Sequence, residues 1–150
     1  MKRYTSDGRF LECPACSGTD FHVGRFSILN DCGIRCTSCG MSIEIRIDSD
    51  EIPDEEYEIT CLDELEKAWN RRPQIKNELE MSPDGYYACP FCGSTSIDHG
   101  AFNISADWIV ICENCGAYME GSIPWNGMTI EEHDAACFEA GRKAWNRRTK

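Results

Sequence analysis

Basic residues are scarce in this 150-residue chain, which counts against the commonest way of binding nucleic acid. Lys and Arg number 15 against 26 Asp and Glu, for a formal net charge of −11. The first 75 residues carry 9 basic and 15 acidic side chains, and the last 75 carry 6 and 11, so neither half is basic. Proteins that hold DNA by its phosphates need a basic face. Direct nucleic-acid binding is therefore not expected.

Long apolar runs are also missing. No segment contains the roughly 20 apolar residues that a membrane-spanning helix needs, and Met1 to Asp7 has no apolar stretch typical of a secretory leader. The eleven cysteines are then not expected to form the disulfides of a secreted protein. We expect a reducing cytoplasm as the compartment.

Motifs of catalysis are absent as well. The sequence contains no glycine-rich phosphate loop, no nucleophile elbow and no His–Glu metalloprotease motif. We therefore do not expect an enzyme.

Cysteine, in contrast, is abundant and regularly spaced. Two Cys-x-x-Cys hooks separated by nineteen residues predict one tetrahedral zinc site of four thiolates, and this arrangement occurs twice. Each site is closed, whereas catalytic zinc keeps an open position. Four thiolates would also suit iron, but the spacer followed by a sheet and a helix favours a zinc ribbon. We expect two Zn²⁺ per chain, on Cys13, Cys16, Cys36 and Cys39 and on Cys89, Cys92, Cys112 and Cys115.

The two sets of cysteines belong to an internal duplication with an offset of 76 residues. Of the 60 aligned pairs that begin with Cys13 and end with Arg72, 22 are identical. The pattern predicts zinc-ribbon modules at residues 8–73 and 86–150, joined by a linker at residues 74–85. Modules this small bury little apolar surface, and a metal ion would stabilise them.

The predicted fold class is a small, metal-stabilised α+β protein. Each module is expected to contain a three-stranded antiparallel sheet and a C-terminal helix. Phe21–Leu29 alternates in part and Met41–Ile47 alternates strictly, as strands do. Patterns of the capping-box type begin at Thr60 and at Thr129, and the polar segment Met1–Gly8 is expected to be mobile.

Three cysteines and three histidines fall outside the metal pattern. Cys61 and Cys137 are aligned with each other and are predicted to be small buried residues. The histidines share no aligned position, so we do not expect them to be zinc ligands. The third of these cysteines is Cys32, and the three histidines are His22, His99 and His133.

An acidic segment precedes the first helix. Between residues 48 and 58 there are seven acidic residues and no basic one. A solvated acidic loop or helix start is the ordinary interpretation, and a face offered to a basic partner is the functional one. These residues are Asp48, Asp50, Glu51, Asp54, Glu55, Glu56 and Glu58.

Three motifs of the second repeat carry a resemblance to a known family. They are Cys-Pro-Phe-Cys-Gly-Ser at 89–94, Cys-x-x-Cys-Gly-Ala at 112–117 and Ala-Trp-Asn-Arg-Arg at 144–148. Through these three motifs the chain resembles the Lar family of restriction-alleviation proteins. These are small phage and prophage proteins that contain a single copy of the repeat. The first repeat departs from the motif at residues 13–18, where the glycine comes one residue late and Ala15 replaces Phe91.

The resemblance implies protection of phage DNA from a type I restriction–modification enzyme in the cytoplasm of a bacterial host. That complex is the expected partner, and the acidic segment and four arginines are the candidate contacts: Arg71, Arg72, Arg147 and Arg148. Two alternatives stay open, a nucleic-acid-binding zinc ribbon that regulates transcription and an adaptor between two proteins. The Trp-Asn-Arg-Arg motif also has a purely structural interpretation, in which Trp packs on the ribbon, Asn hydrogen-bonds and the arginines close the helix.

Overall fold

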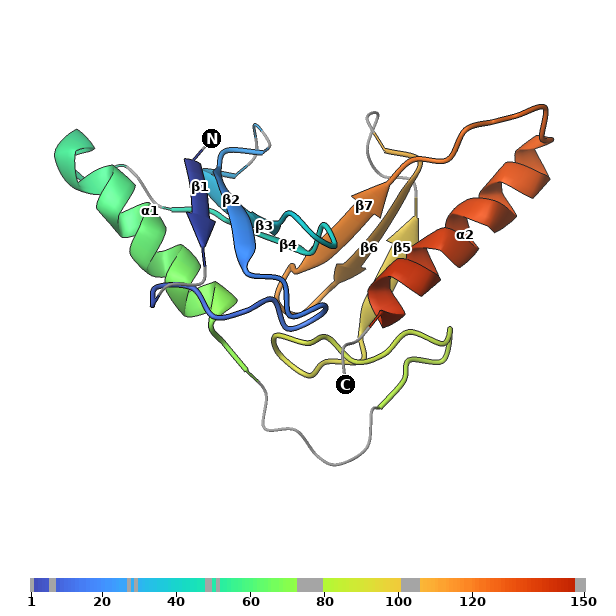
Figure 1. Cartoon of the computed structure of the whole chain (residues 1–150), viewed down its shortest axis with the longest axis horizontal. Helices are drawn as coiled ribbons and strands as arrows, with labels where there is room; N and C mark the ends of the chain where they lie inside the picture. Colours follow the sequence, from blue (N-terminus) through green and yellow to red (C-terminus); the bar gives the residue numbers. More distant parts are fainter. Residues whose placement is uncertain are drawn as a thin grey trace.

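The structure, a computed structural model, describes residues 8–26, 28, 30–47, 50, 52–72, 80–100 and 106–147, and the backbone of residues 2–5. It confirms a small α+β fold with an antiparallel sheet, and the two helices lie on opposite sides of the molecule with the strands between them (Figure 1). The elements are β1 (Lys2–Thr5), β2 (Asp20–Gly24), β3 (Cys32–Cys36), β4 (Ser42–Ile45), α1 (Asp54–Trp69), β5 (Ile97–Gly100), β6 (Trp108–Cys112), β7 (Tyr118–Gly121) and α2 (Ile130–Asn146).

All seven described strands belong to one sheet, in the order β1-β2-β3-β4-β7-β6-β5. The described residues up to 72, here called the first half, supply one end of this sheet, and those from 80 onwards, the second half, supply the other. The halves meet where β4 pairs with β7, through Ser42 opposite Tyr118. α1 packs on β3 and β4, and α2 packs on β5, β6 and β7.

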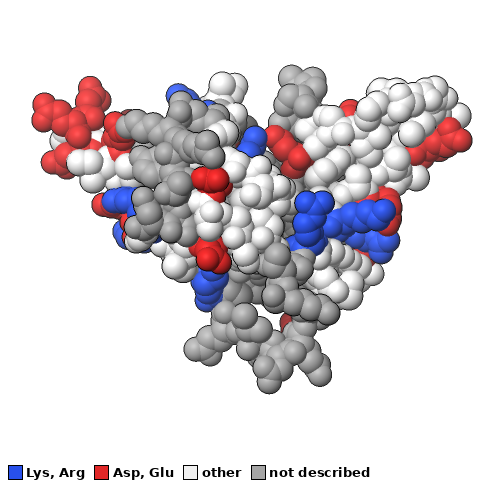
Figure 2. Space-filling model, in the orientation of Figure 1, with Lys and Arg blue, Asp and Glu red and all other residues white. Residues whose placement is uncertain are grey.

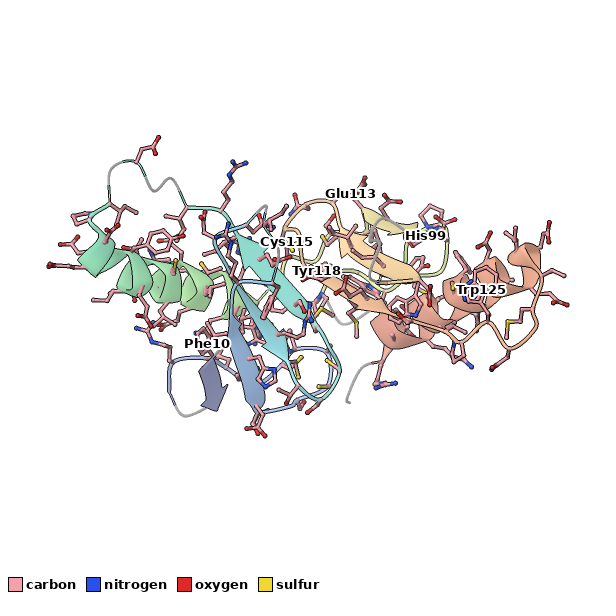
Figure 3. The ribbon with its side chains drawn as sticks, turned by 90° about the horizontal axis from the view of Figure 1, so that it is seen from above. Phe10, His99, Glu113, Cys115, Tyr118 and Trp125 are labelled. Carbon is pink, nitrogen blue, oxygen red and sulfur yellow. The ribbon has the colours of Figure 1, made fainter. Side chains whose placement is uncertain are left out.

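Side chains strengthen this junction. The Arg35 guanidinium donates to Ser42 Oγ at 2.8 Å and to Tyr118 Oη at 3.1 Å, and it lies 3.4 Å from Glu120 Oε1. Figure 3 shows Tyr118 at the place where the two halves meet. The buried ring of Phe91 also lies 5.1 Å from that of Trp69 in the other half. The two repeats therefore share one sheet and one apolar core.

The N-terminal segment corrects the sequence-based prediction. We predict three strands per repeat and a mobile segment at Met1–Gly8, but residues 2–5 form β1, which pairs antiparallel with β2. An edge strand of this kind is held by backbone hydrogen bonds, and Lys-Arg-Tyr-Thr has no apolar alternation that would reveal it. In the second half Met81 instead forms an isolated bridge with Tyr87. Among the described residues, no strand pairs with the outer edge of β5.

The start of α1 is a second correction. The predicted cap at Thr60 is wrong, because α1 begins at Asp54 and the Thr60 hydroxyl donates to the Glu56 carbonyl inside the helix at 3.0 Å. Acidic residues fill the first turn of α1, where the helix dipole favours negative charge. The predicted capping box of α2 is confirmed: Glu132 N donates to Thr129 Oγ1 at 3.2 Å, and Thr129 N donates to Glu132 Oε2 at 2.9 Å.

Both helices bury the same tryptophan position. Trp69 and Trp145 are completely buried, as the duplication predicts. In α1 the buried residues recur every four positions at Cys61, Leu65 and Trp69, which places them on one helix face. Within the described residues, neither helix combines the length and apolar character needed to cross a bilayer.

Candidate metal centres

The eight cysteines predicted as ligands form two groups of four, one in each half. Within each group the four Sγ atoms lie within 4.8 Å of one another. Cys13 and Cys39 are 3.6 Å apart, as are Cys16 and Cys36, and the corresponding distances in the second half are 3.5 Å. A tetrahedral ion with metal–sulfur bonds of about 2.3 Å would separate its ligands by about 3.8 Å. Each group can therefore hold one metal ion.

The second hook of each group follows directly from a strand. Cys36 ends β3 and Cys112 ends β6, and the chain then turns so that Gly40 N donates to Cys36 O at 2.9 Å and Gly116 N to Cys112 O at 2.8 Å. These glycines have φ of 79° and 77°, a region that suits glycine because it has no Cβ. The turn brings the last cysteine of each hook back toward the first.

The late glycine of the first hook has a structural reason. Ser17, aligned with Gly93, adopts φ of 57° in spite of its side chain. The next residue, Gly18, lies so close to the sulfurs that a Cβ there would be 3.0 Å from Cys36 Sγ and 3.1 Å from Cys16 Sγ. Its N–H donates to Cys16 Sγ at 3.3 Å. The glycine is thus needed at position 18 because the backbone approaches the metal group there.

Gly18→Ala is expected to weaken metal binding by the first group. The added methyl would displace two ligand sulfurs, and changes around metal ligands commonly cost about 10- to 100-fold in affinity. Competition with a chromophoric chelator should show one of the two ions leaving earlier. Ser94→Ala, the aligned change in the second half, is the control and should leave both affinities unchanged. Equal affinities in the Gly18→Ala protein would contradict the crowding argument.

The ionisation of the thiols also favours a bound cation. Hydrogen bonds from Cys13 and Cys39 lower the pKa of Cys36. The pKa of Cys13 is raised, and the largest cause is its hydrogen bond with Cys36. In the second half the pKa of Cys112 is lowered and that of Cys89 is raised in the same way. The thiols of a group thus compete for negative charge, and a divalent cation would stabilise all of them as thiolates.

The Trp-Asn pair at the end of each helix holds the segment that leads into the first hook. Trp69 Nε1 donates to Leu11 O at 2.9 Å, Asn70 Nδ2 donates to Arg9 O at 2.7 Å, and Leu11 N donates to Asn70 Oδ1 at 2.8 Å. The second half repeats all three bonds, between Trp145 or Asn146 and the backbone of Gly85 or Tyr87. The buried Trp and the hydrogen-bonded Asn are the arrangement that the structural interpretation of the Trp-Asn-Arg-Arg motif predicts.

The arginines of the motif differ in their surroundings. The Arg72 guanidinium donates to the carbonyls of Trp69 and Glu12 and lies 5.7 Å from the centre of the Phe91 ring. It therefore closes α1 and reaches across to the second half. Arg71 and Arg147 are exposed, and Arg148 lies outside the described residues.

The acidic segment is only partly described. Asp50, Asp54, Glu55, Glu56 and Glu58 are exposed, whereas Asp48 and Glu51 lie outside the described residues. Figure 2 shows acidic side chains gathered over the start of α1. The segment is therefore available to solvent where the structure describes it.

The shared role of two aligned aspartates was not predicted from the sequence. Asp31 Oδ2 accepts a hydrogen bond from Ile47 N at 2.7 Å, and Asp107 Oδ2 accepts one from Ile123 N at 2.8 Å. The bond from Ile47 lowers the pKa of Asp31. Each aspartate thus ties the residue before one strand to a residue that follows the neighbouring strand of the sheet. The identity of the aligned pair was the signal that could have indicated a shared role.

The remaining cysteines and histidines lie outside the two metal groups. Cys61 and Cys137 are buried, as predicted, and so is Cys32. His133 is buried with Nε2 3.0 Å from the Ile123 carbonyl, whereas His22 is exposed.

Comparison with known proteins finds no relative: no family model, no curated protein and no solved structure matches the chain. The resemblance to Lar units therefore rests on the three motifs, and the metal centres rest on their geometry.

Proposed function

We propose that this protein consists of two tandem zinc ribbons and acts by binding another protein, without chemistry of its own. The observation that supports this most directly is the pair of four-sulfur groups, each of which can supply a complete ligand set for one ion. Structural zinc sites are filled by four protein ligands, whereas catalytic sites leave one position to water or substrate. Both ions would therefore stabilise the fold.

Charge indicates the kind of partner. The protein carries a net charge of −11, and eight thiolates outweigh two Zn²⁺, so metal binding makes it more acidic. Opposite charge on a partner speeds association and fixes orientation. An enzyme that holds DNA presents a basic channel, and the exposed acids around the start of α1 offer a complementary surface. Together with the Lar-like motifs, this makes a type I restriction–modification complex the partner that we propose.

The duplication fits the same proposal. The two halves are in contact through β4, β7 and the Phe91–Trp69 ring pair. Two similar units held side by side gain avidity when both reach one assembly. Alleviation of restriction in the bacterial cytoplasm is then the proposed outcome of binding.

The test is the efficiency of plating of unmodified phage on a restricting host with and without this protein. We expect the protein to raise plating, and Glu55→Gln/Glu58→Gln to reduce that gain by removing two exposed charges. The control is Glu80→Gln/Asp84→Asn, which removes two exposed charges from the second half at positions not aligned with the acidic segment. Metal content should stay constant in all three proteins.

Several outcomes would separate the alternatives. No gain in plating across a panel of type I systems would contradict the proposed partner. A DNA shift at low salt, where electrostatic binding is strongest, would instead favour the nucleic-acid-binding alternative. A gain that both variants retain would preserve the activity but exclude these acids as the contact surface.

A further inference from the structure

A cavity of about 250 Å³ lies in the second half, between α2 and the strands β5 and β6. It belongs neither to the metal groups nor to the acidic segment. Figure 3 shows His99 of β5 beside α2. Aromatic and acidic side chains dominate its described lining: Tyr86, His99, Asp107, Trp108, Asp134 and Phe138.

Three of the rings form a fixed corner of this cavity. Tyr86 and His99 stack with their centres 5.6 Å apart, and Phe138 meets both rings edge-on, at 6.0 Å and 4.7 Å respectively. Phe138 is 37% exposed, so this corner reaches the surface. The Tyr86 hydroxyl itself is buried, so a ligand that enters there has to displace part of this corner to reach it.

The cavity lies where the two repeats diverge. At the position where the first half has the fully buried Leu65, the second half has Gly141. A Cβ at position 141 would lie 3.0 Å from Val110 and 3.2 Å from the ring of Trp108, which stands where the first half has Cys32. Trp108 and Val110 thus fill the space beside Gly141 that a leucine would need, and the cavity lies next to them.

The hydroxyl of Tyr86 is the strongest sign of a ligand. Tyr86 is completely buried and lines the cavity, yet its hydroxyl oxygen has no hydrogen-bond partner among the described residues. A buried polar group without a partner destabilises a fold. The aligned residue of the first half is Phe10, also buried, so the ribbon does not require a hydroxyl at this position.

The charges around the cavity select the kind of ligand. Asp107 and Asp134 line it, and no Lys or Arg is among its described lining residues. Carboxylates repel anions, and the faces of aromatic rings attract cations. An organic cation with a short apolar chain suits the Asp134 carboxylate, the rings and the hydroxyl together, whereas Asp107 already accepts a hydrogen bond from Ile123 N.

We propose that this cavity binds a primary alkylammonium group, supplied either by a free amine or by a lysine side chain of another protein. The ammonium would lie between the aromatic corner and Asp134 and donate a hydrogen bond to the Tyr86 hydroxyl. This site does not depend on the proposed function of the whole protein.

The experiment uses the full-length, metal-loaded protein and n-butylammonium chloride, with sodium chloride as the ionic-strength control. In ¹H–¹⁵N spectra we expect saturable shifts of the Trp108 indole and of the Gly100 and Gly141 amides. The neutral 1-butanol, of similar size, should bind about tenfold more weakly because it lacks the charge. N-acetyl-lysine methylamide distinguishes the two sources: it binds if the site takes a protein side chain and fails to bind if the site takes only a free amine.

Two variants test the named residues. Tyr86→Phe copies the first half and should stay folded while binding the amine more weakly, and Asp134→Asn should also weaken binding. Glu131→Gln, an exposed acid on the same helix that does not line the cavity, is the matched control and should bind as the unmodified protein does. Non-saturable shifts, equal binding of 1-butanol, or full binding by both cavity variants would overturn the proposal.

Discussion

Cys112→Ser is expected to release one of two metal ions and to unfold the second half. Cys112 is completely buried and lies 3.5 Å from Cys92 across the group. Structural zinc binding contributes about 10–16 kcal/mol, which in such sites is folding free energy. Whole domains are stable by only about 5–15 kcal/mol. Loss of one ligand should therefore remove most of the stability of this half.

Metal analysis and circular dichroism together make the measurement. The unmodified protein should contain two zinc ions per chain, and the Cys112→Ser protein should contain one and lose part of its helix and strand signal. Cys137→Ser is the matched control, because Cys137 is buried but belongs to neither group; it should keep both ions. Two ions in the Cys112→Ser protein would show that the ligand assignment is wrong, and iron in place of zinc would contradict the proposed metal.

The metal groups could be predicted because their signal is local. Four thiolates converge only when the hooks have the right spacing, and the duplication shows the same spacing twice. The burial of Trp69 and Trp145 could be predicted for a related reason, since the aligned motif places both on the last turn of a helix. Their hydrogen bonds to the backbone at positions 11 and 87 were expected only in outline.

The features that sequence reasoning missed depend on contacts between distant segments. β1 pairs through its backbone, which leaves no pattern in Lys-Arg-Tyr-Thr. The role of Phe91, which lies between Cys89 and Cys92 in the second half, could not be assigned from the sequence. Its partner Trp69 comes from the other repeat. The cavity lies beside Trp108 and Gly141, two positions at which the repeats differ, and such differences give no periodic signal.

Trp69→Ala is expected to destabilise the protein by about 3–5 kcal/mol, as for other large-to-small changes in cores. The ring is completely buried and lies 5.1 Å from both Phe21 and Phe91, so a cavity would open on either side. Denaturant unfolding in excess zinc measures the change. Trp69→Phe keeps an aromatic ring but leaves the Leu11 carbonyl without its donor, and should cost less, about 1–3 kcal/mol. Loss of under 1 kcal/mol in the alanine variant would contradict the burial of this ring.

The same residue tests whether the two repeats share one core. If they do, Trp69 and Phe91 stabilise each other across the junction, and a double-mutant cycle with Trp69→Leu and Phe91→Leu should give a coupling of about 0.5–1.5 kcal/mol, the range for aromatic pairs. Arg72, which lies over the same Phe91 ring, adds a cation to this contact. Independent ribbons joined only by their connecting segment would give a coupling near zero. In that case Phe91 would be exposed, and the surface around it, between Cys89 and Cys92, would become a candidate binding surface.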